Sequence, residues 1–313
     1  MAYQNVGTPR FWVNILEWLA ATGYSSIDDR YRTLPVGNYH MTVSSSMNVP
    51  NHSGIFNDKS FVAILGHNLP GYNYSVRYDN TGFGLNGVGF VNADPQPANS
   101  GMGWLSTYNG FSIITLDGTA IEQPWIAVSF STSCYAGSII FGTYYDIPHS
   151  PDLKLTMKRE MDGVKRVRTK GGSDLIHNKY TKSPLWGNAA PWELYSGTPL
   201  AQELARIGRR VWDLSFSYLS DSDVFPLISN MNFYESGIAY ADSFGNTLLD
   251  SNTFYSQVIH KTNGGQLPFI FQPDKDNNNP DGFAIAKFDM ISFKFDQVAN
   301  GVYNVKLKIR EVW

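Results

Sequence analysis

The densest group of charged side chains in this 313-residue chain is a basic run, in which seven of the 24 lysines and arginines lie between residues 154 and 170. Such cations can contact phosphate groups or the carboxylates of a neighbouring protein. Two acids interrupt the run, and aromatic side chains that would stack on bases do not alternate with it. We therefore expect a contact with an acidic protein first, a solvated edge strand second and nucleic acid third. The cations predicted to lie at an interface are Arg159, Lys165, Arg166 and Arg168, with Arg206, Arg209 and Arg210 as a second contact.

An acidic loop near residue 280 is the first candidate for a metal site. Asp274, Asp276 and Asn278 place oxygen atoms at alternate positions, which is the ligand type that Ca²⁺ prefers. An EF-hand also needs glycine at the sixth position and glutamate at the twelfth, where this chain has Asn279 and Ile285. A polar hairpin loop explains the segment better, so we predict neither a metal nor a cofactor.

Catalytic motifs are missing or stand in the wrong context. Residues 82–87 match GxGxxG by letter, but the proline-containing sequence after them cannot open the helix that a dinucleotide site needs. The chain contains no GxxxxGK[ST], HExxH or GxSxG motif. Acid pairs at 28–29 and at 221 and 223 fall at expected turns or helix caps. We predict that the protein is not an enzyme, although a Ser–His–Asp site assembled from distant residues leaves no trace in sequence.

The composition narrows the class of protein further. Only 16% of the residues are charged, against about 25% in an ordinary soluble domain. Asparagine and glycine, with 25 and 28 residues, supply much of the polar cover, and 14% aromatic residues can fill a core. The net charge of −3 gives no overall attraction to nucleic acid. The single cysteine, Cys134, has no basic neighbour and is expected to be a buried small apolar residue.

Membrane and export signals are not found in this sequence. No run approaches 18 apolar residues, so we predict no membrane insertion. The first residues lack the charged start and apolar run of a signal peptide, so we expect synthesis in the cytoplasm without a cleaved signal.

Short apolar runs cut by glycine, proline and asparagine predict a mainly β protein. The spacing is typical of antiparallel sandwiches or jelly rolls, and crossover helices between the runs are missing. The predicted strands are 60–66, 87–91, 111–116, 125–130, 138–145, 269–271, 284–295 and 302–312.

Helices and turns are predicted between these strands. Apolar residues at helical spacing, from Trp12 to Leu19, predict a helix in the first 25 residues, and a second helix is expected from Pro199 to about Trp212. A hairpin is expected to turn at residues 162–163, and the last one at Asn300-Gly301.

The expected architecture is therefore two antiparallel β-sandwich modules joined by a segment that contains a helix. The predicted division is a helical arm at 1–40, a sandwich at 41–175, a connecting segment at 176–212 and a second sandwich at 213–313.

Three stretches resemble tail proteins of tailed bacteriophages. Residues 61–69, Phe-Val-Ala-Ile-Leu-Gly-His-Asn-Leu, are similar to the first core strand and turn of a galactose-binding-like jelly roll, as is the segment 142–153 that leads into the basic run. The residues from 265 to 313 also resemble a minor tail or baseplate protein. The resemblance carries no catalytic signature and no ligand residues.

This resemblance implies a structural virion protein of the tail tip, the baseplate or the junction with a fibre. It implies assembly rather than catalysis, with other virion tail proteins and further copies in a ring as partners, and a location in the virion tail. Two alternatives stay open. One is a carbohydrate-binding module that recognises a host glycan through an open aromatic platform, and the other is a glycan-degrading enzyme with two carboxylates facing a cleft.

Overall fold

The structure of the chain is a computed structural model. It describes residues 5–24, 26–37, 39–42, 46–50, 59–68, 74–79, 91–92, 106–108, 111–116, 125–130, 132–161, 164–178, 208–226, 247–278 and 282–312.

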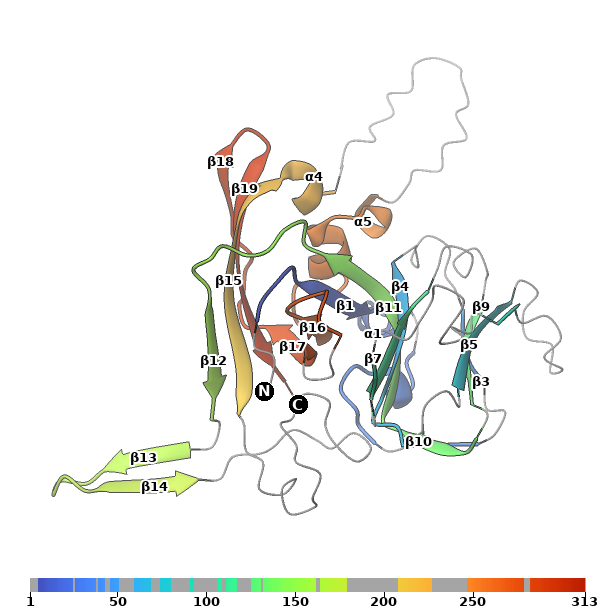
Figure 1. Cartoon of the computed structure of the whole chain (residues 1–313), viewed down its shortest axis with the longest axis horizontal. Helices are drawn as coiled ribbons and strands as arrows, with labels where there is room; N and C mark the ends of the chain where they lie inside the picture. The colour runs from blue at the N-terminus through green and yellow to red at the C-terminus, as the bar shows by residue number, and fades with distance from the viewer. Residues whose placement is uncertain are drawn as a thin grey trace.

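An antiparallel sheet of 11 strands forms the centre of the protein (Figure 1). In spatial order, its strands are β12 (Thr156–Glu160), β15 (Arg209–Ser220), β19 (Val302–Glu311), β17 (Ala284–Phe288), β16 (Phe269–Gln272), β1 (Arg10–Asn14), β11 (Ser138–Asp146), β4 (Ser60–Leu65), β8 (Phe111–Thr115) and β7 (Ser106–Tyr108), and β18 (Phe295–Ala299) pairs with β19.

Three smaller sheets and a few short helices accompany the large sheet. The four-stranded sheet contains β3 (Ser46–Pro50), β9 (Trp125–Phe130), β5 (Tyr74–Asp79) and β6 (Val91–Asn92). The two-stranded sheets are β2 (Tyr39–Met41) with β10 (Cys134–Ala136), and β13 (Val164–Arg168) with β14 (Asp174–Asn178). The helices are α1 (Ile15–Ala21), the 3₁₀ turn η1 (Asp29–Tyr31), α4 (Asp221–Val224), α5 (Thr247–Asp250) and the π-helix η2 (Tyr255–His260). No helix in the described ranges is long and apolar enough to cross a membrane.

The mainly β class is confirmed, and most predicted strands lie where they were expected. Strands β4, β8, β9, β11, β16 and β19 match the predicted runs, whereas most of 87–91 lies outside the described residues. The predicted run 284–295 is divided into β17 and the start of β18. Gly301 has a φ of +67° in the turn between β18 and β19, as the Asn300-Gly301 signal predicts.

The first 25 residues differ from the prediction of a single helix. Residues Arg10–Asn14 form strand β1, and the helix begins only at Ile15. The side-chain oxygen of Asn14 accepts hydrogen bonds from the backbone N–H groups of Leu16 and Glu17, so it caps the first turn. Periodicity could not place this boundary, because a strand buried on both faces is apolar at every position, like a buried helix.

The core fills both faces of the large sheet around β1. Phe11 and Val13 point into a cluster with η2 and the strands near the carboxyl end, and Trp12 points to the opposite face, into a cluster with Phe61. All four side chains are at most 1% exposed. Strands β4 and β11 are also buried on both faces, which explains why their sequences are continuous apolar runs.

The predicted arrangement of two separate sandwiches is not confirmed. One sheet contains β1 from the predicted helical segment at 1–40, β4 and β11 from the first predicted module, and β16 to β19 from the second. Strand β1 joins the two halves, because it pairs with β11 on one side and with β16 on the other. Strand β15 also runs through the predicted boundary between residues 212 and 213.

The predicted helix ending at Trp212 is wrong in its last turn. Its first part lies outside the described residues, but Arg209 and Arg210 belong to strand β15. In this strand, Trp212, Leu214 and Phe216 alternate with less buried residues and point inward. A register shift after Phe216 leaves Tyr218 exposed at a φ of +62°.

The pairing of β1 with β11 depends on a glycine. A Cβ added to Gly142 would lie 1.9 Å from the carbonyl oxygen of Val13, so Gly142→Ala must push the two strands apart. We expect a loss of about 3 kcal/mol or more in the free energy of unfolding, measured with urea, or no folded protein at all. The matched control is Gly171→Ala, whose Cβ would meet only the Thr169 hydroxyl at 4.0 Å. Equal stability of the two variants would contradict the role assigned to β1.

Candidate functional site

Of the cations predicted to lie at an interface, Arg159, Arg209 and Arg210 lie together at one end of the large sheet. Arg159 on β12 lies directly opposite Arg210 on β15, and Glu160 lies opposite Arg209. Lys165, Arg166 and Arg168 follow on β13, whereas Arg206 lies outside the described residues. Arg159 of the first predicted contact is therefore a neighbour of Arg209 and Arg210 of the second.

The predicted hairpin that turns at residues 162–163 is wrong. Strand β12 pairs with β15, while β13 pairs with β14 through a turn at residues 169–173. In that turn, the N–H of Gly172 donates to the carbonyl of Thr169 at 3.0 Å, and Gly172 has a φ of +85°. Two turn signals compete in this segment, Asp-Gly and Gly-Gly, and the second one makes the hairpin.

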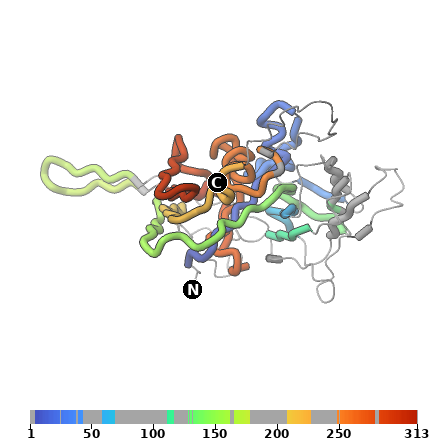
Figure 2. Tube along the Cα trace, turned by 90° about the horizontal axis from the view of Figure 1, so that it is seen from above, coloured from blue at the N-terminus to red at the C-terminus, as the bar shows by residue number. Residues whose placement is uncertain are grey.

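Residues 164–178, hereafter the arm, form a two-stranded ribbon that extends well away from the body of the protein (Figure 2). Side chains directly opposite one another share a face of the ribbon. One face carries Val167 and Leu175, which are 45% and 62% exposed. The other face carries Arg166 opposite Ile176, and Ile176 is 59% exposed. Both faces of the arm thus present large apolar side chains to solvent.

The charge of the arm is mostly positive and is partly paired within the ribbon. The guanidinium of Arg166 donates to the carboxylate of Asp174, and the Nε of Arg168 lies 3.4 Å from the same carboxylate. These arginine side chains are 63% and 74% exposed, so the ion pairs contribute little to stability. Lys165 and Lys170 are exposed as well, and they have no acid beside them on the ribbon. The arm can therefore present cations on a partly apolar surface.

The base of the arm is a crossing of two chain segments that requires a glycine. Gly208, immediately before β15, has a φ of +71°. A Cβ at this position would lie 2.6 Å from the carbonyl oxygen of Glu160 and 2.9 Å from the sulfur of Met161. The end of β12 and the start of β15 thus approach one another too closely for any other residue.

Arg210 is not an exposed interface charge. The residue is 5% exposed, and its guanidinium donates to the carboxylate of Glu311 at 2.9 Å and to the carbonyl of Phe283 at 2.6 Å. It also lies over the ring of Trp212, 5.3 Å from its centroid. A buried charge needs such partners, because an unpaired one loses its hydration without compensation. Arg210 therefore holds β15 to β19 inside the chain.

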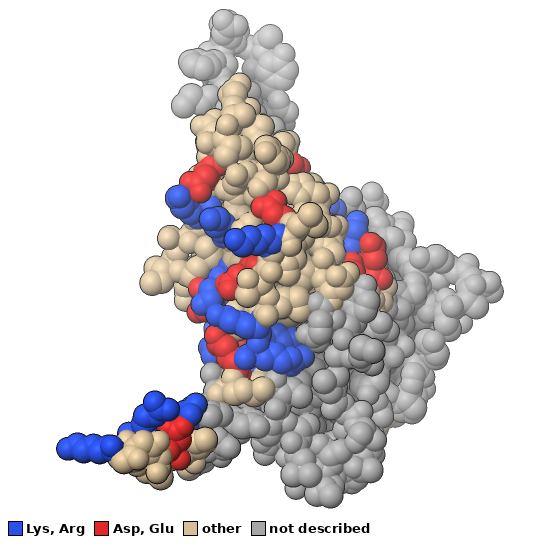
Figure 3. Space-filling view, turned by 60° about the vertical axis from the view of Figure 1, so that its left-hand side comes forward, with Lys and Arg blue, Asp and Glu red and all other residues tan. Residues whose placement is uncertain are grey.

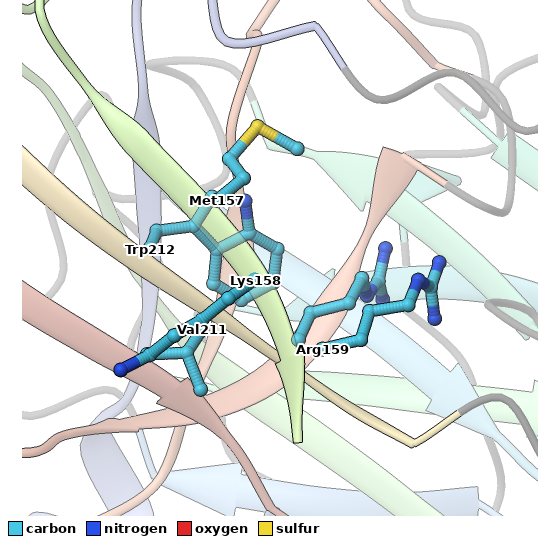
Figure 4. A pocket seen from close by; sticks show the side chains of 6 residues that line it. Met157, Lys158, Arg159, Val211 and Trp212 are labelled. Carbon is cyan, nitrogen blue, oxygen red and sulfur yellow. The ribbon is translucent and has the colours of Figure 1, made fainter. Parts of the chain in front are cut away.

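A small cavity, lined in part by Arg210 itself, lies at this end of the sheet (Figure 4). It has a volume of about 160 Å³ and is lined by side chains of β12 and β15, among them Arg159 and Trp212. Lys158 and Arg159 point to opposite sides of β12. Burial lowers the pKa of the Arg159 guanidinium, as does the nearby charge of Arg210, while Glu311 acts in the opposite direction. Burial, the larger cause, disfavours any charge here, and Arg210 disfavours a second cation beside it.

The outer face of β12, β15 and β19 is a mixed-charge surface (Figure 3). Arg310 donates to Glu160 at 2.8 Å, and Lys308 forms an ion pair with Asp289. The Lys308 ammonium lowers the pKa of the Asp289 carboxyl through their hydrogen bond. Cations and acids alternate here in local pairs, as on an ordinary solvated strand, so the arm differs from the face beside it.

The remaining sequence candidates have structural roles in the described residues. Cys134 is buried, and burial raises the pKa of its thiol to about 11. Asp28 accepts hydrogen bonds from the backbone and the side chain of Arg30, which lower the pKa of its carboxyl. Asp223 forms a capping box with Ser220 at the start of α4. The predicted roles as caps and turns are confirmed for these acids.

The metal candidates are engaged in hydrogen bonds that shape their loop. A carboxylate oxygen of Asp274 accepts from the N–H of Asp276 at 3.2 Å, and the side-chain oxygen of Asn278 accepts from Gln272 at 3.1 Å. No group of three histidine, cysteine or acidic side chains comes together in the part of the chain that is described. The loop also holds the start of the chain, since Lys275 donates its N–H to the carbonyl of Thr8.

A serine and a histidine from distant positions do meet, although no motif indicates it. The Nε2 of His67 lies 2.7 Å from the hydroxyl of Ser112, and the residues are 2% and 0% exposed. Burial lowers the pKa of His67 to about 4. A nucleophile needs access to its substrate, so this pair is interpreted as a polar contact of the core. Trp12, Trp18 and Trp212, the tryptophans whose side chains are described, are also buried and form no sugar platform.

No protein-family model matches the chain, and neither a curated protein nor a solved structure is significantly similar to it. The functional interpretation therefore depends on the geometry of this chain and on its residues.

The buried pair at the base of the arm leads to a prediction. Replacing Glu311 by glutamine leaves the charge of Arg210 buried without a carboxylate, and we expect a loss of about 3 kcal/mol or more in the free energy of unfolding. The control is Asp289→Asn, which breaks an ion pair whose side chains are 38% and 40% exposed, and it should cost less than about 1 kcal/mol. Urea unfolding at pH 7 measures both. Equal losses would show that Arg210 finds its stabilisation elsewhere.

His67 predicts how stability depends on pH. The unfolded chain binds a proton at this histidine below about pH 6.5, whereas the folded chain binds it only near pH 4. Its contribution to stability is therefore complete above pH 6.5 and falls as the pH drops through this window, by about 2 kcal/mol at pH 5.

The measurement is urea unfolding of the wild type and of His67→Gln at pH 7 and at pH 5. From pH 7 to pH 5, the free energy of unfolding should fall by about 2 kcal/mol less in the variant than in the wild type. This difference does not depend on the stability of the variant at pH 7. Identical losses in the two proteins would contradict the neutral, buried state of His67.

Proposed function

We propose that the protein is a structural component of a tailed-phage virion, and that it acts by assembly, with the arm in contact with a neighbouring protein. The observation that carries the assembly part is the arm itself. It presents Val167, Leu175 and Ile176 to solvent on a ribbon of only two strands.

Such a ribbon gains little from its own contacts. A hairpin of two strands is marginally stable in water, because it has no second layer on which to bury its side chains. The three exposed side chains would gain hydrophobic free energy when a neighbour covers them. Exposed apolar groups rimmed by cations are typical of protein–protein contacts, in which charges guide association and apolar groups supply affinity.

The virion part of the proposal rests on the sequence. Residues 61–69, 142–153 and 265–313 resemble tail proteins of tailed phages. A chain with only 16% charged residues adds support, since subunits with few charges repel one another little when they pack together. Assembly, rather than catalysis, also agrees with the structural roles found for the acids and for the buried histidine.

An arm variant tests this function. Replacing Val167 and Leu175 by serine removes apolar groups that are exposed in the single chain, so we expect a free energy of unfolding within about 0.5 kcal/mol of the wild type. Incorporation into particles should fall by roughly tenfold or more, because the contact loses its apolar centre. Quantitative mass spectrometry of purified virions, from a phage that encodes the variant, measures the incorporation.

The matched control replaces Leu153 and Ile291 by serine, two fully exposed apolar residues outside the arm. This control should enter particles like the wild type. The wild-type chain missing from purified virions would refute the virion role, and full incorporation of the arm variant would refute the role of the arm.

A further inference from the structure

The two outer edges of the arm are open in the part of the chain that the structure describes. Strands β13 and β14 pair only with each other there, and the ribbon extends away from the other sheets (Figure 2). An open edge presents a row of backbone N–H and C=O groups with which another strand can pair. A third strand can thus add to the arm on either side.

The hydrogen bonds of the turn show which backbone groups of the arm face outward. Thr169 donates its N–H to the carbonyl of Ser173 at 2.8 Å, so these two residues form a hydrogen-bonded pair. Hydrogen-bonded and non-hydrogen-bonded pairs alternate along an antiparallel ladder. Leu175 therefore bonds within the ribbon, whereas the N–H and C=O groups of Arg166 and Ile176 point away from it, toward opposite edges.

The two edges differ in their protection against pairing. Natural edge strands are guarded by lysine, by other charges or by proline. Strand β13 has this protection, because it carries three cations in five residues. Strand β14 contains no lysine, arginine or proline, and it exposes two neighbouring apolar residues, Leu175 and Ile176, one on each face of the ribbon. The open edge of β14 is thus the one that favours an added strand.

We infer that β14 pairs with an extended, acidic segment of a neighbouring protein, which adds a third strand to the arm. This inference rests on the proposed function and states the chemistry of the partner in that contact. The added strand bonds to the outward N–H and C=O of Ile176, and its side chains cover Leu175 on one face and Ile176 on the other. The arm also gains stability, because three strands with apolar contacts are more stable than two.

The charge of the arm selects an acidic segment. Four cations and one acid lie between Lys165 and Asp174, which gives the arm a formal charge of +3. The single acid is already paired with arginines of the ribbon. Acidic side chains at the ends of the added segment offset the remaining charge, and β-branched side chains at its centre meet Leu175 and Ile176.

The probe is a synthetic peptide, acetyl-Glu-Thr-Val-Val-Thr-Glu-amide, added at millimolar concentration to the ¹⁵N-labelled full-length protein. NMR spectra follow each backbone amide of the arm. We expect the amide hydrogen of Ile176 to move downfield because it gains a hydrogen bond, while that of Arg166 on the other edge changes little. A peptide with lysine in place of both glutamates should bind roughly tenfold more weakly.

Two proline variants at positions opposite each other in register form a matched pair. Ile176→Pro removes the outward N–H of β14, and Arg166→Pro removes the outward N–H of β13, so neither variant loses a hydrogen bond of the ribbon. Ile176→Pro should weaken binding of the acidic peptide by roughly tenfold or more, and Arg166→Pro by less than about threefold. Ile176→Ala keeps the N–H and separates the hydrogen bond from the side chain. The amide signal of Leu175 shows that the ribbon is intact in each variant.

Three results would overturn the inference. They are equal losses in the two proline variants, a downfield shift at Arg166 in place of Ile176, and no shift at Ile176. Equal shifts with single-stranded DNA would overturn it as well, since the arm would then bind anions of any kind.

Incorporation of the same proline variants into virions separates this inference from the proposed function. If Ile176→Pro enters particles like the wild type while the serine variant of the arm does not, the partner covers the arm without pairing to its edge. The inference is then overturned, and the assembly function stands. Pairing of the peptide along β14 in a chain that is missing from virions would support the inference and refute the virion role.

Discussion

The rest of the fold depends on strand β1, because β1 lies between the two halves of the large sheet and joins them. It is hydrogen-bonded to β11 along one edge and to β16 along the other. Its three central side chains fill cores on both faces, and the indole of Trp12 donates to the side-chain oxygen of Gln272 at 3.1 Å. Without it, two sheet edges and several large apolar side chains would be exposed to water.

The position of the arm follows from this constraint. Strand β16 leads through β17 and β19 to β15, and β15 holds β12, from which the arm projects. The bidentate pair of Arg10 with Asp146, at 2.5 and 2.9 Å, fixes the register at the start of β1. A shift of one residue there would exchange the two faces of the strand and expel Trp12 from its core. The place from which the arm projects is thus linked through the sheet to residues near the start of the chain.

Much of the fold is predictable from local pattern, and the failures have physical causes. Strands β4, β8, β11 and β19 are bounded by turn residues, and their apolar positions correspond to the strand faces that are buried. Their limits were therefore predicted nearly correctly. Strand β1 was missed because it is apolar on both faces and merges into the helix after it. The pairing of β12 was missed because its partner, β15, lies about 50 residues further on, and no local signal reports such pairing.

The candidate site was predictable only in part, because local pattern locates charges along the chain but does not report burial or distant partners. Charge density alone located the basic run, and the last residues of the run, 164–170, form the first part of the arm. The exposed apolar side chains of the arm were not recognised, because Val167, Leu175 and Ile176 look like core residues in a sequence, and only their exposure in the folded chain distinguishes them. The burial of Arg210 was equally hidden, since its partner Glu311 is 101 residues away.

The separation of Arg210 and Glu311 in the sequence determines when this ion pair can form during synthesis. During synthesis Arg210 emerges first, and the carboxylate that neutralises it follows only 101 residues later, about 5–20 s at ordinary rates of translation. Until then β15 has no β19 to pair with, and β12 has no settled strand beside it. A chain that is interrupted in this interval already contains the complete arm but has no firm base to hold it. The ion pair beneath the arm is therefore complete only in a chain that has been translated as far as Glu311.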